Sequence, residues 1–186
     1  MGDFGLWTAI LLSGGGNDVA GSEFQMLLDH ARSPKPGLNE SVVSGVIDQR
    51  VRSALVTIVS ASTELCRQKL GEPVPILVHG YDYAVADGRG FLCGWGPLPG
   101  PWLEPGFRQK GYASIQDRLA IVREMIDRFN AMLLSVASLP EFKHVKYVDL
   151  RQTLSSGADY KDWWADELHP SRQGFAAVAG RIAARL

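Results

Sequence analysis

Asp166 and His169 have the residue types and the spacing of an acid–base site. They stand three positions apart in the stretch Asp166-Glu167-Leu168-His169-Pro170, just before a predicted helix. At this spacing a carboxylate can reach one imidazole nitrogen and leave the other facing a crevice. The histidine then accepts a proton, and the carboxylate fixes its tautomer and stabilises the imidazolium. An aspartate and a histidine at this spacing also fit a purely structural pair. The motif alone does not distinguish the catalytic role from the structural one.

A second candidate motif, Gly15-Gly16-Asn17-Asp18, follows a short apolar run. Glycines let the backbone approach a ligand closely, and an asparagine amide can donate to the oxyanion that develops in acyl transfer. The alternative is a strand-to-helix turn in which Asn17 is the N-cap. Asn17 is therefore a candidate oxyanion donor, and Gly15 and Gly16 are candidate substrate-binding residues.

Together the two motifs resemble those of the SGNH hydrolases, the GDSL-like lipases and esterases. Residues 15–18 are similar to that family's Gly-x-Asn-Asp block, and residues 166–170 to its Asp-x-x-His-Pro block, which precedes a typical alanine-rich helix. The resemblance covers nearly the whole chain. It implies that Asn17 is an oxyanion-hole donor, His169 the base and Asp166 the residue that orients it. It also implies a small-molecule ester substrate, and neither a cofactor nor a metal.

The family fold that this resemblance implies is a three-layer α/β/α sandwich with a parallel sheet, of the flavodoxin-like kind. Two family blocks have no counterpart here: the Gly-Asp-Ser block with the nucleophilic serine, and the block with a second oxyanion donor. Gly2-Asp3-Phe4 is superficially similar to the nucleophile block, but phenylalanine cannot attack a carbonyl. We therefore expect residues 1–186 to form a single domain that is N-terminally truncated and matches the carboxyl-terminal part of the family fold.

Ser13 and Cys93 are the other nucleophile candidates within the chain. Ser13 ends an apolar run before three glycines, but it lacks the Gly-x-Ser-x-Gly elbow of other serine hydrolases. Cys93 has no histidine near it in the sequence. On the hydrolase hypothesis, the nucleophilic serine is therefore expected upstream of Met1, and the sequence leaves open whether one is encoded there.

The elements that must position these residues alternate between strand and helix, which indicates an α/β fold with parallel strands and helices on both faces. Short apolar runs predict strands at Thr8–Ser13, Val74–His79 and Val145–Leu150. Residues 84–112 show no regular period and predict a long loop, either a substrate lid or a static cover.

Helices are predicted from apolar stripes and capping residues. A short helix carries Phe24, Leu27, Leu28 and Ala31 on one face. A long helix from about Ser41 to Leu70, capped by Asn39, buries Val43, Ile47, Val51, Leu55, Ile58, Ser62 and Leu65. A helix capped by Ser114 buries Ile115, Leu119, Val122, Ile126, Phe129 and Leu133. A last helix buries Phe175, Val178, Ala179, Ile182 and Leu186.

In open α/β sheets the active crevice lies at the carboxyl ends of the strands. Asn17 follows the first predicted strand, Tyr81 the second, and the Asp166–His169 pair comes after the third, so we expect them to converge. Tyr81, Trp163 and Trp164 are candidate substrate-binding residues.

Four of these neighbouring residues have alternative interpretations. Core packing of one tryptophan, with partial exposure of the other, is the alternative for Trp163 and Trp164. His79 ends a strand and is interpreted as a core histidine. Asp82 fits either the crevice or a turn.

Composition narrows the classes of function. Hydrophobic residues make up 46% of the chain and charged residues 21%, as in globular domains, and the formal net charge is −1. No basic surplus points to nucleic acid, and no apolar run is long enough for a membrane span. Two cysteines cannot form a disulfide framework. No signal peptide opens the chain, so we leave its localisation open, with the cytoplasm expected for the chain as it stands.

Two main functions remain. The first is an SGNH-type hydrolase of ester bonds whose serine is missing from this chain, and the second is a non-catalytic truncated member that binds a ligand or self-assembles. A weaker third possibility is hydrolysis by water that the Asp166–His169 pair activates directly. Loss of the family's outer strands would leave Thr8–Ser13 as a bare edge, so we also expect a homo-oligomer.

Overall fold

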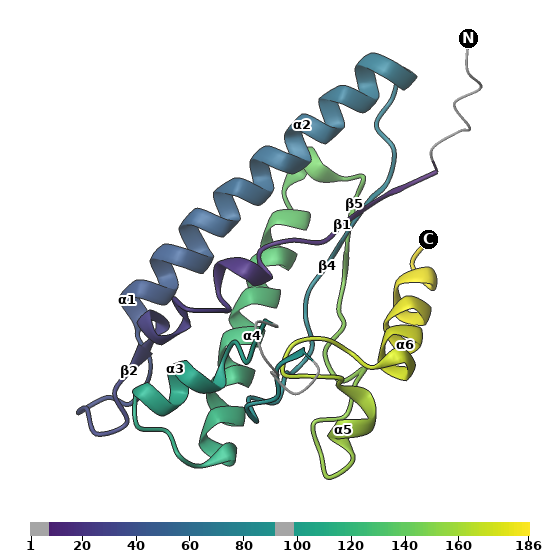
Figure 1. The fold of residues 1–186 in the computed structure, drawn as a ribbon. Coiled ribbons are helices and arrows are strands. Elements are labelled where there is room, and N and C mark those ends of the chain that lie inside the picture. The colour runs from purple at the N-terminus through teal and green to yellow at the C-terminus, as the bar shows by residue number, and fades with distance from the viewer. Residues whose placement is uncertain (1–7, 92–98) are drawn as a thin grey trace.

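Three parallel strands form the central sheet of the computed structural model, which describes residues 8–91 and 99–186 (Figure 1). The strands are β1 (Ile10–Leu12), β4 (Ile76–His79) and β5 (Val145–Val148), in the order β1-β4-β5. Leu11 of β1 lies opposite Leu77 of β4. The fold is therefore mixed α/β with a parallel sheet, as predicted, and all three predicted strands are confirmed at slightly shorter lengths.

Helices cover both faces of this sheet. Figure 1 shows α2 and α4 on one side of the strands and α6 on the other. Ile76, Val78 and Val145 point toward the larger core that α2 and α4 cover, whereas Leu77 and Val148 belong to the smaller cluster beneath α6. The alternation of side chains along a strand produces these two faces. No helix among residues 8–91 and 99–186 is both long enough and apolar enough to cross a membrane.

The long predicted helix is present as a continuous run of α1 (Glu40–Val43), the π-helical turn η3 (Ser44–Val51) and α2 (Arg52–Leu70). The Asn39 side chain accepts a hydrogen bond from the Val42 backbone N–H, so the predicted N-cap is confirmed. Gly71, with a φ of 87°, ends the helix in the left-handed conformation.

The buried stripe of this helix differs from the prediction in its second half. Val43, Ile47, Val51 and Leu55 are buried as expected, and the stripe continues through Val59, Thr63 and Cys66. Ile58 and Leu65 were expected in the core and are exposed instead. Leu65 borders an open groove beside β1, where it lines a cavity of about 510 Å³ together with Ile10, Leu70 and Val74.

The predicted short helix after Gly16 is wrong in its details. The chain forms two 3-10 turns, η1 (Gly16–Asp18) and η2 (Phe24–Leu27), and then a two-stranded hairpin of β2 (Leu28–Asp29) and β3 (Gly37–Leu38). Phe24, Leu27 and Leu28 are buried as predicted. The helix stops because Asn39 donates to Asp29 and its backbone N–H bonds the Leu27 carbonyl, which draws the segment into the hairpin.

Helix α4 (Ile115–Ala137) begins at the predicted N-cap Ser114 and buries most of its predicted stripe, although Ile115 is exposed and Leu119 is only half-buried. The segment expected to be a loop contains a helix, α3 (Glu104–Gln109), which the sequence analysis missed. The 3-10 turn η5 (Pro140–Phe142) precedes β5, and the short helix α5 (Tyr160–Trp163) lies between β5 and α6.

Helix α6 (Arg172–Ala183) packs more lightly than predicted. Val178 and Ile182 contact the cluster of Leu77, Val148 and Leu150. The predicted core residues Phe175, Ala179 and Leu186 are exposed, because only one edge of this single helix meets the sheet.

Candidate active site

The carboxylate of Asp166 contacts the imidazole of His169, as the sequence predicted. Both carboxylate oxygens lie 3.0 Å from the His169 Nδ1. The Asp166 side chain is 3% exposed and that of His169 is 56% exposed. The acid is therefore buried while the base faces solvent.

Two backbone groups hold Asp166 in place. Its Oδ1 accepts hydrogen bonds of 2.8 Å from the N–H groups of Leu168 and His169. A carboxylate bound this way accepts the Nδ1–H of His169 and so leaves Nε2 as the unprotonated nitrogen. Within the described residues, Nε2 of His169 has no hydrogen-bond partner, and it is free to take a proton from a bound molecule.

A tight turn presents this pair at the surface. The Ala165 N–H bonds the His169 carbonyl at 2.9 Å, and the Ser171 N–H bonds the Trp163 carbonyl at 2.8 Å. Ser171 then caps α6 by accepting from the Gly174 N–H. The turn is thus closed at its base and tied to a helix, which fixes the backbone beneath the Asp166–His169 pair.

The Asn17 motif lies directly after β1, in η1. The Gly16 N–H donates to the Tyr81 hydroxyl, and that hydroxyl donates to the Gly14 carbonyl, both at 3.2 Å. Gly15 occupies the N-cap position and no side chain caps this turn, so the interpretation of Asn17 as an N-cap is wrong. Asn17 is exposed, and its amide is available to a ligand.

The two glycines of this motif are required by protein packing. Gly15 has φ of 88°, and a Cβ there would lie 2.7 Å from the ring of Phe129. A Cβ on Gly16 would lie 2.9 Å from the ring of Tyr81. The close backbone approach that the glycines permit is therefore made to Phe129 and Tyr81, and Tyr81 supports the turn that carries Asn17.

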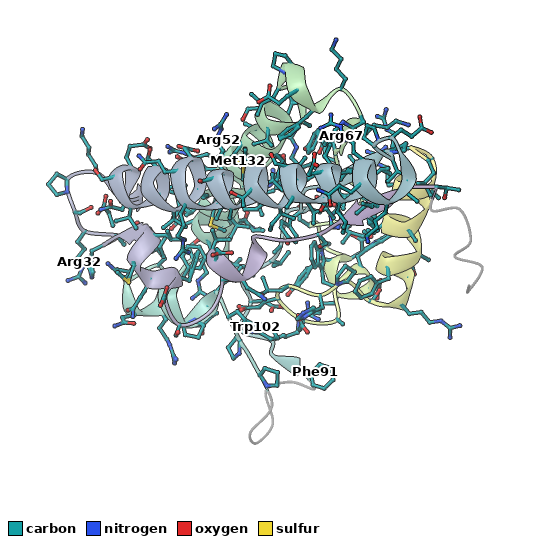
Figure 2. The ribbon with its side chains drawn as sticks, turned by 90° about the horizontal axis from the view of Figure 1, so that it is seen from above. Arg32, Arg52, Arg67, Phe91, Trp102 and Met132 are labelled. Carbon is teal, nitrogen blue, oxygen red and sulfur yellow. The ribbon has the colours of Figure 1, made fainter. Side chains whose placement is uncertain are left out.

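Trp102 connects the two motifs. Its ring packs edge to face on the His169 ring, with centroids 5.2 Å apart and an interplanar angle of 73°. Its carbonyl accepts from the N–H of Gly21, four residues after Asn17, at 3.3 Å. In the view of Figure 2, Trp102 lies below the purple turn and near the yellow segment. Trp102 therefore contacts the His169 ring directly, and its backbone is bonded to the chain three residues beyond Asp18. Joint action of Asn17 and His169 on one group stays a prediction.

The two neighbouring tryptophans differ in burial, as the alternative interpretation of Trp163 and Trp164 proposed. Trp164 is 3% exposed and donates its indole N–H to the Ser155 carbonyl, which gives it a packing role. Trp163 is half-buried and donates to the Asp159 carboxylate. Of the two, Trp163 has the surface available to touch a ligand.

Asp82 has a structural role. It is buried and accepts hydrogen bonds from the N–H groups of Tyr83, Gln152 and Leu154. It therefore ties the loop after β4 to the loop after β5. His79 is half-buried, and its ring bonds the Gly80 carbonyl and packs on Tyr81.

No hydroxyl or thiol among the described residues is hydrogen-bonded to the His169 ring. Ser13 is exposed after β1, and no hydrogen bond joins it to the His169 ring in the described chain. Gly2-Asp3-Phe4 and Cys93 lie outside the described residues. Across residues 8–91 and 99–186 there is also no cluster of acidic, histidine or cysteine side chains suited to hold a metal.

No family model, curated protein or solved structure matches the chain. The relationship to the SGNH hydrolases thus stays a prediction, which rests on the two sequence motifs and on the geometry around them.

Proposed function

We propose that this chain carries the acid–base part of an SGNH-type ester hydrolase, with the sheet, α2, α4 and α6 as the three layers of that fold. The observation that carries the proposal is the buried Asp166 carboxylate on Nδ1 of an exposed His169, whose Nε2 has no hydrogen-bond partner among the described residues. This arrangement suits a histidine that takes a proton from a serine hydroxyl and returns it to the leaving alcohol.

The reaction proceeds in two steps. A serine oxygen, supplied by a segment outside this sequence, attacks the ester carbonyl while His169 Nε2 takes its proton. The Asn17 amide donates to the resulting oxyanion. Collapse breaks the bond to the alcohol oxygen, which receives the proton from His169, and an acyl-serine remains. Water then attacks the acyl-serine with His169 again as base, which releases the acid and restores the serine.

The coding sequence ahead of Met1 tests this proposal. We expect an in-frame Gly-Asp-Ser upstream, and we expect the extended protein to hydrolyse short aryl esters and to bind one fluorophosphonate at that serine. An extended protein that folds but neither hydrolyses esters nor takes the label would overturn the proposal.

The 186-residue chain by itself is expected to hydrolyse short aryl esters at close to the uncatalysed rate. No hydroxyl or thiol among the described residues is hydrogen-bonded to His169, and general-base help to water alone supplies little of the rate that covalent catalysis gives. Turnover of 4-nitrophenyl acetate and fluorophosphonate labelling, read by mass spectrometry, check this. Stoichiometric labelling of Ser13 would show that the nucleophile lies within the chain.

Self-association is a second candidate function, because β1 has no strand partner on its outer side among the described residues. Leu11 in this strand is 54% exposed, and the apolar groove along α2 lies beside it. A strand edge carries unpaired backbone groups that another strand can satisfy, and a second copy about a twofold axis offers the same edge.

We therefore expect the 186-residue chain to form a dimer at low micromolar concentration and Leu11→Lys to shift it to monomer, because a lysine blocks edge pairing. Met26→Lys is the matched control, since Met26 is an equally exposed apolar residue in η2, away from β1. Light scattering behind size exclusion measures the mass. A wild-type chain that elutes as a monomer would contradict this prediction.

A further inference from the structure

Glu167, between the two residues of the candidate acid–base pair, is fully buried. Its two carboxylate oxygens accept hydrogen bonds from four backbone N–H groups: Gly88 at 2.8 Å, Trp102 at 2.8 Å, Leu103 at 2.8 Å and Glu104 at 3.1 Å. Its own N–H bonds the Arg89 carbonyl. A single side chain therefore fastens two distant segments to the turn that carries the site.

Burial raises the pKa of the Glu167 carboxyl, and the four N–H donors oppose that rise. The donors favour the ionised form, which is acceptor-only and can satisfy all four of them. Removing a carboxylate from water costs free energy unless both of its oxygens are hydrogen-bonded. The geometry therefore indicates that the role of Glu167 is to hold the backbone segments that it bonds.

The segment that Glu167 holds is the one that contacts His169. Trp102 donates its backbone N–H to Glu167 and places its ring against the imidazole. The next two residues, Leu103 and Glu104, are bonded to the same carboxylate, and Leu103 is buried. The position of the Trp102 ring thus depends on Glu167 through the backbone rather than through a side-chain contact.

We propose that Glu167 is a positioning residue for the candidate base: it anchors residues 102–104 so that the Trp102 ring flanks His169 while Asp166 holds Nδ1. The two acidic residues of the stretch Asp166-Glu167-Leu168-His169 then have different contacts. Asp166 fixes the imidazole directly, and Glu167 fixes the wall beside it. The inference rests on the proposed function for the role of His169, but the arrangement itself can be tested without any activity.

Nuclear magnetic resonance on the 186-residue chain tests the proposal. Glu167→Gln replaces one acceptor oxygen with a donor, so at least one pair of N–H groups loses its partner. Two results are expected: amide exchange at residues 102–104 speeds up by roughly tenfold or more, and the His169 ring resonances move toward their positions in Trp102→Leu. The control is Glu141→Gln, which removes the same charge from an exposed residue. It should change neither the amide exchange at residues 102–104 nor the His169 resonances.

A folded Glu167→Gln variant with faster amide exchange but unmoved His169 resonances would overturn the proposal, because Glu167 would then be structural only. If that variant does not fold, Trp102→Leu decides. It leaves the four backbone donors in place, so exchange should stay slow while the His169 resonances move. Unmoved His169 resonances in Trp102→Leu would equally overturn the proposal.

Activity separates this inference from the proposed function. Moved His169 resonances in an extended protein that shows no esterase activity would reject the hydrolase and keep the positioning role. In an active extended protein, Glu167→Gln should lower kcat more than it changes KM, because the base is displaced while the rest of the crevice persists.

Discussion

His169→Ala is expected to lower kcat/KM for short aryl esters by roughly 10²- to 10⁴-fold in the protein that joins this chain to its nucleophilic serine. The imidazole is the one group on the Asp166–His169 turn with a nitrogen that faces solvent and can take a proton. Without it, the serine must lose its proton to water. Initial rates with 4-nitrophenyl acetate measure the loss.

Asp166→Asn should cause a loss of the same order, although it changes only one atom. An asparagine can keep one oxygen for the Leu168 and His169 N–H groups, but its amide N–H₂ group cannot accept the Nδ1–H of His169. The imidazole would then be stabilised in the wrong tautomer, with its proton on Nε2.

The matched control for these variants is His30→Ala. His30 is exposed in the hairpin between β2 and β3, where its Nδ1 accepts a hydrogen bond from the Arg32 N–H. The His30→Ala substitution should therefore leave the rate of ester hydrolysis unchanged. Full activity in His169→Ala, with the serine still labelled by fluorophosphonate, would remove His169 from the mechanism and the acid–base proposal with it.

The Asp166–His169 contact could be predicted because it is local. Three residues separate the two side chains, and a turn closed by its own backbone brings them together. Trp102 and Glu167 could not be found in the same way. Their contact joins positions 65 residues apart, and nothing in the sequence of residues 84–112 signals where that chain returns to the site. The sequence shows only that a glutamate lies between the two candidate site residues.

The difference between local and long-range contacts also explains which parts of the fold were predicted wrongly. The caps Asn39 and Ser114 act within three residues of themselves and were predicted correctly. Ile58 and Leu65 were placed in the core from apolar periodicity, which reports that a face is apolar but not what covers it. Leu65 borders the groove beside β1, and no described residue fills that groove. Leu65 therefore marks the groove next to the β1 edge on which the dimer prediction depends.

Gly80→Ala is expected to destabilise the chain by about 2–4 kcal/mol, because the site it would fill is already occupied. Gly80 follows β4, and a Cβ there would overlap the side-chain oxygen of Asn130 and lie 2.7 Å from its Cγ. Asn130 is buried at 1% exposure and cannot step aside. Its Oδ1 accepts from the Tyr147 hydroxyl at 2.5 Å, and its Nδ2 donates to the carbonyls of Ile126 and Tyr81.

Any shift of Asn130 that relieves this overlap breaks bonds to buried groups and releases the Tyr81 backbone beneath the Asn17 turn. Urea denaturation of Gly80→Ala measures the cost. Gly180→Ala is the control of opposite sign: nothing lies within 4 Å of its Cβ position in α6, and alanine should stabilise that helix by roughly 0.5–1 kcal/mol. A Gly80→Ala midpoint equal to that of the wild type would show that Asn130 can move away from β4 without loss of stability, and would contradict the prediction.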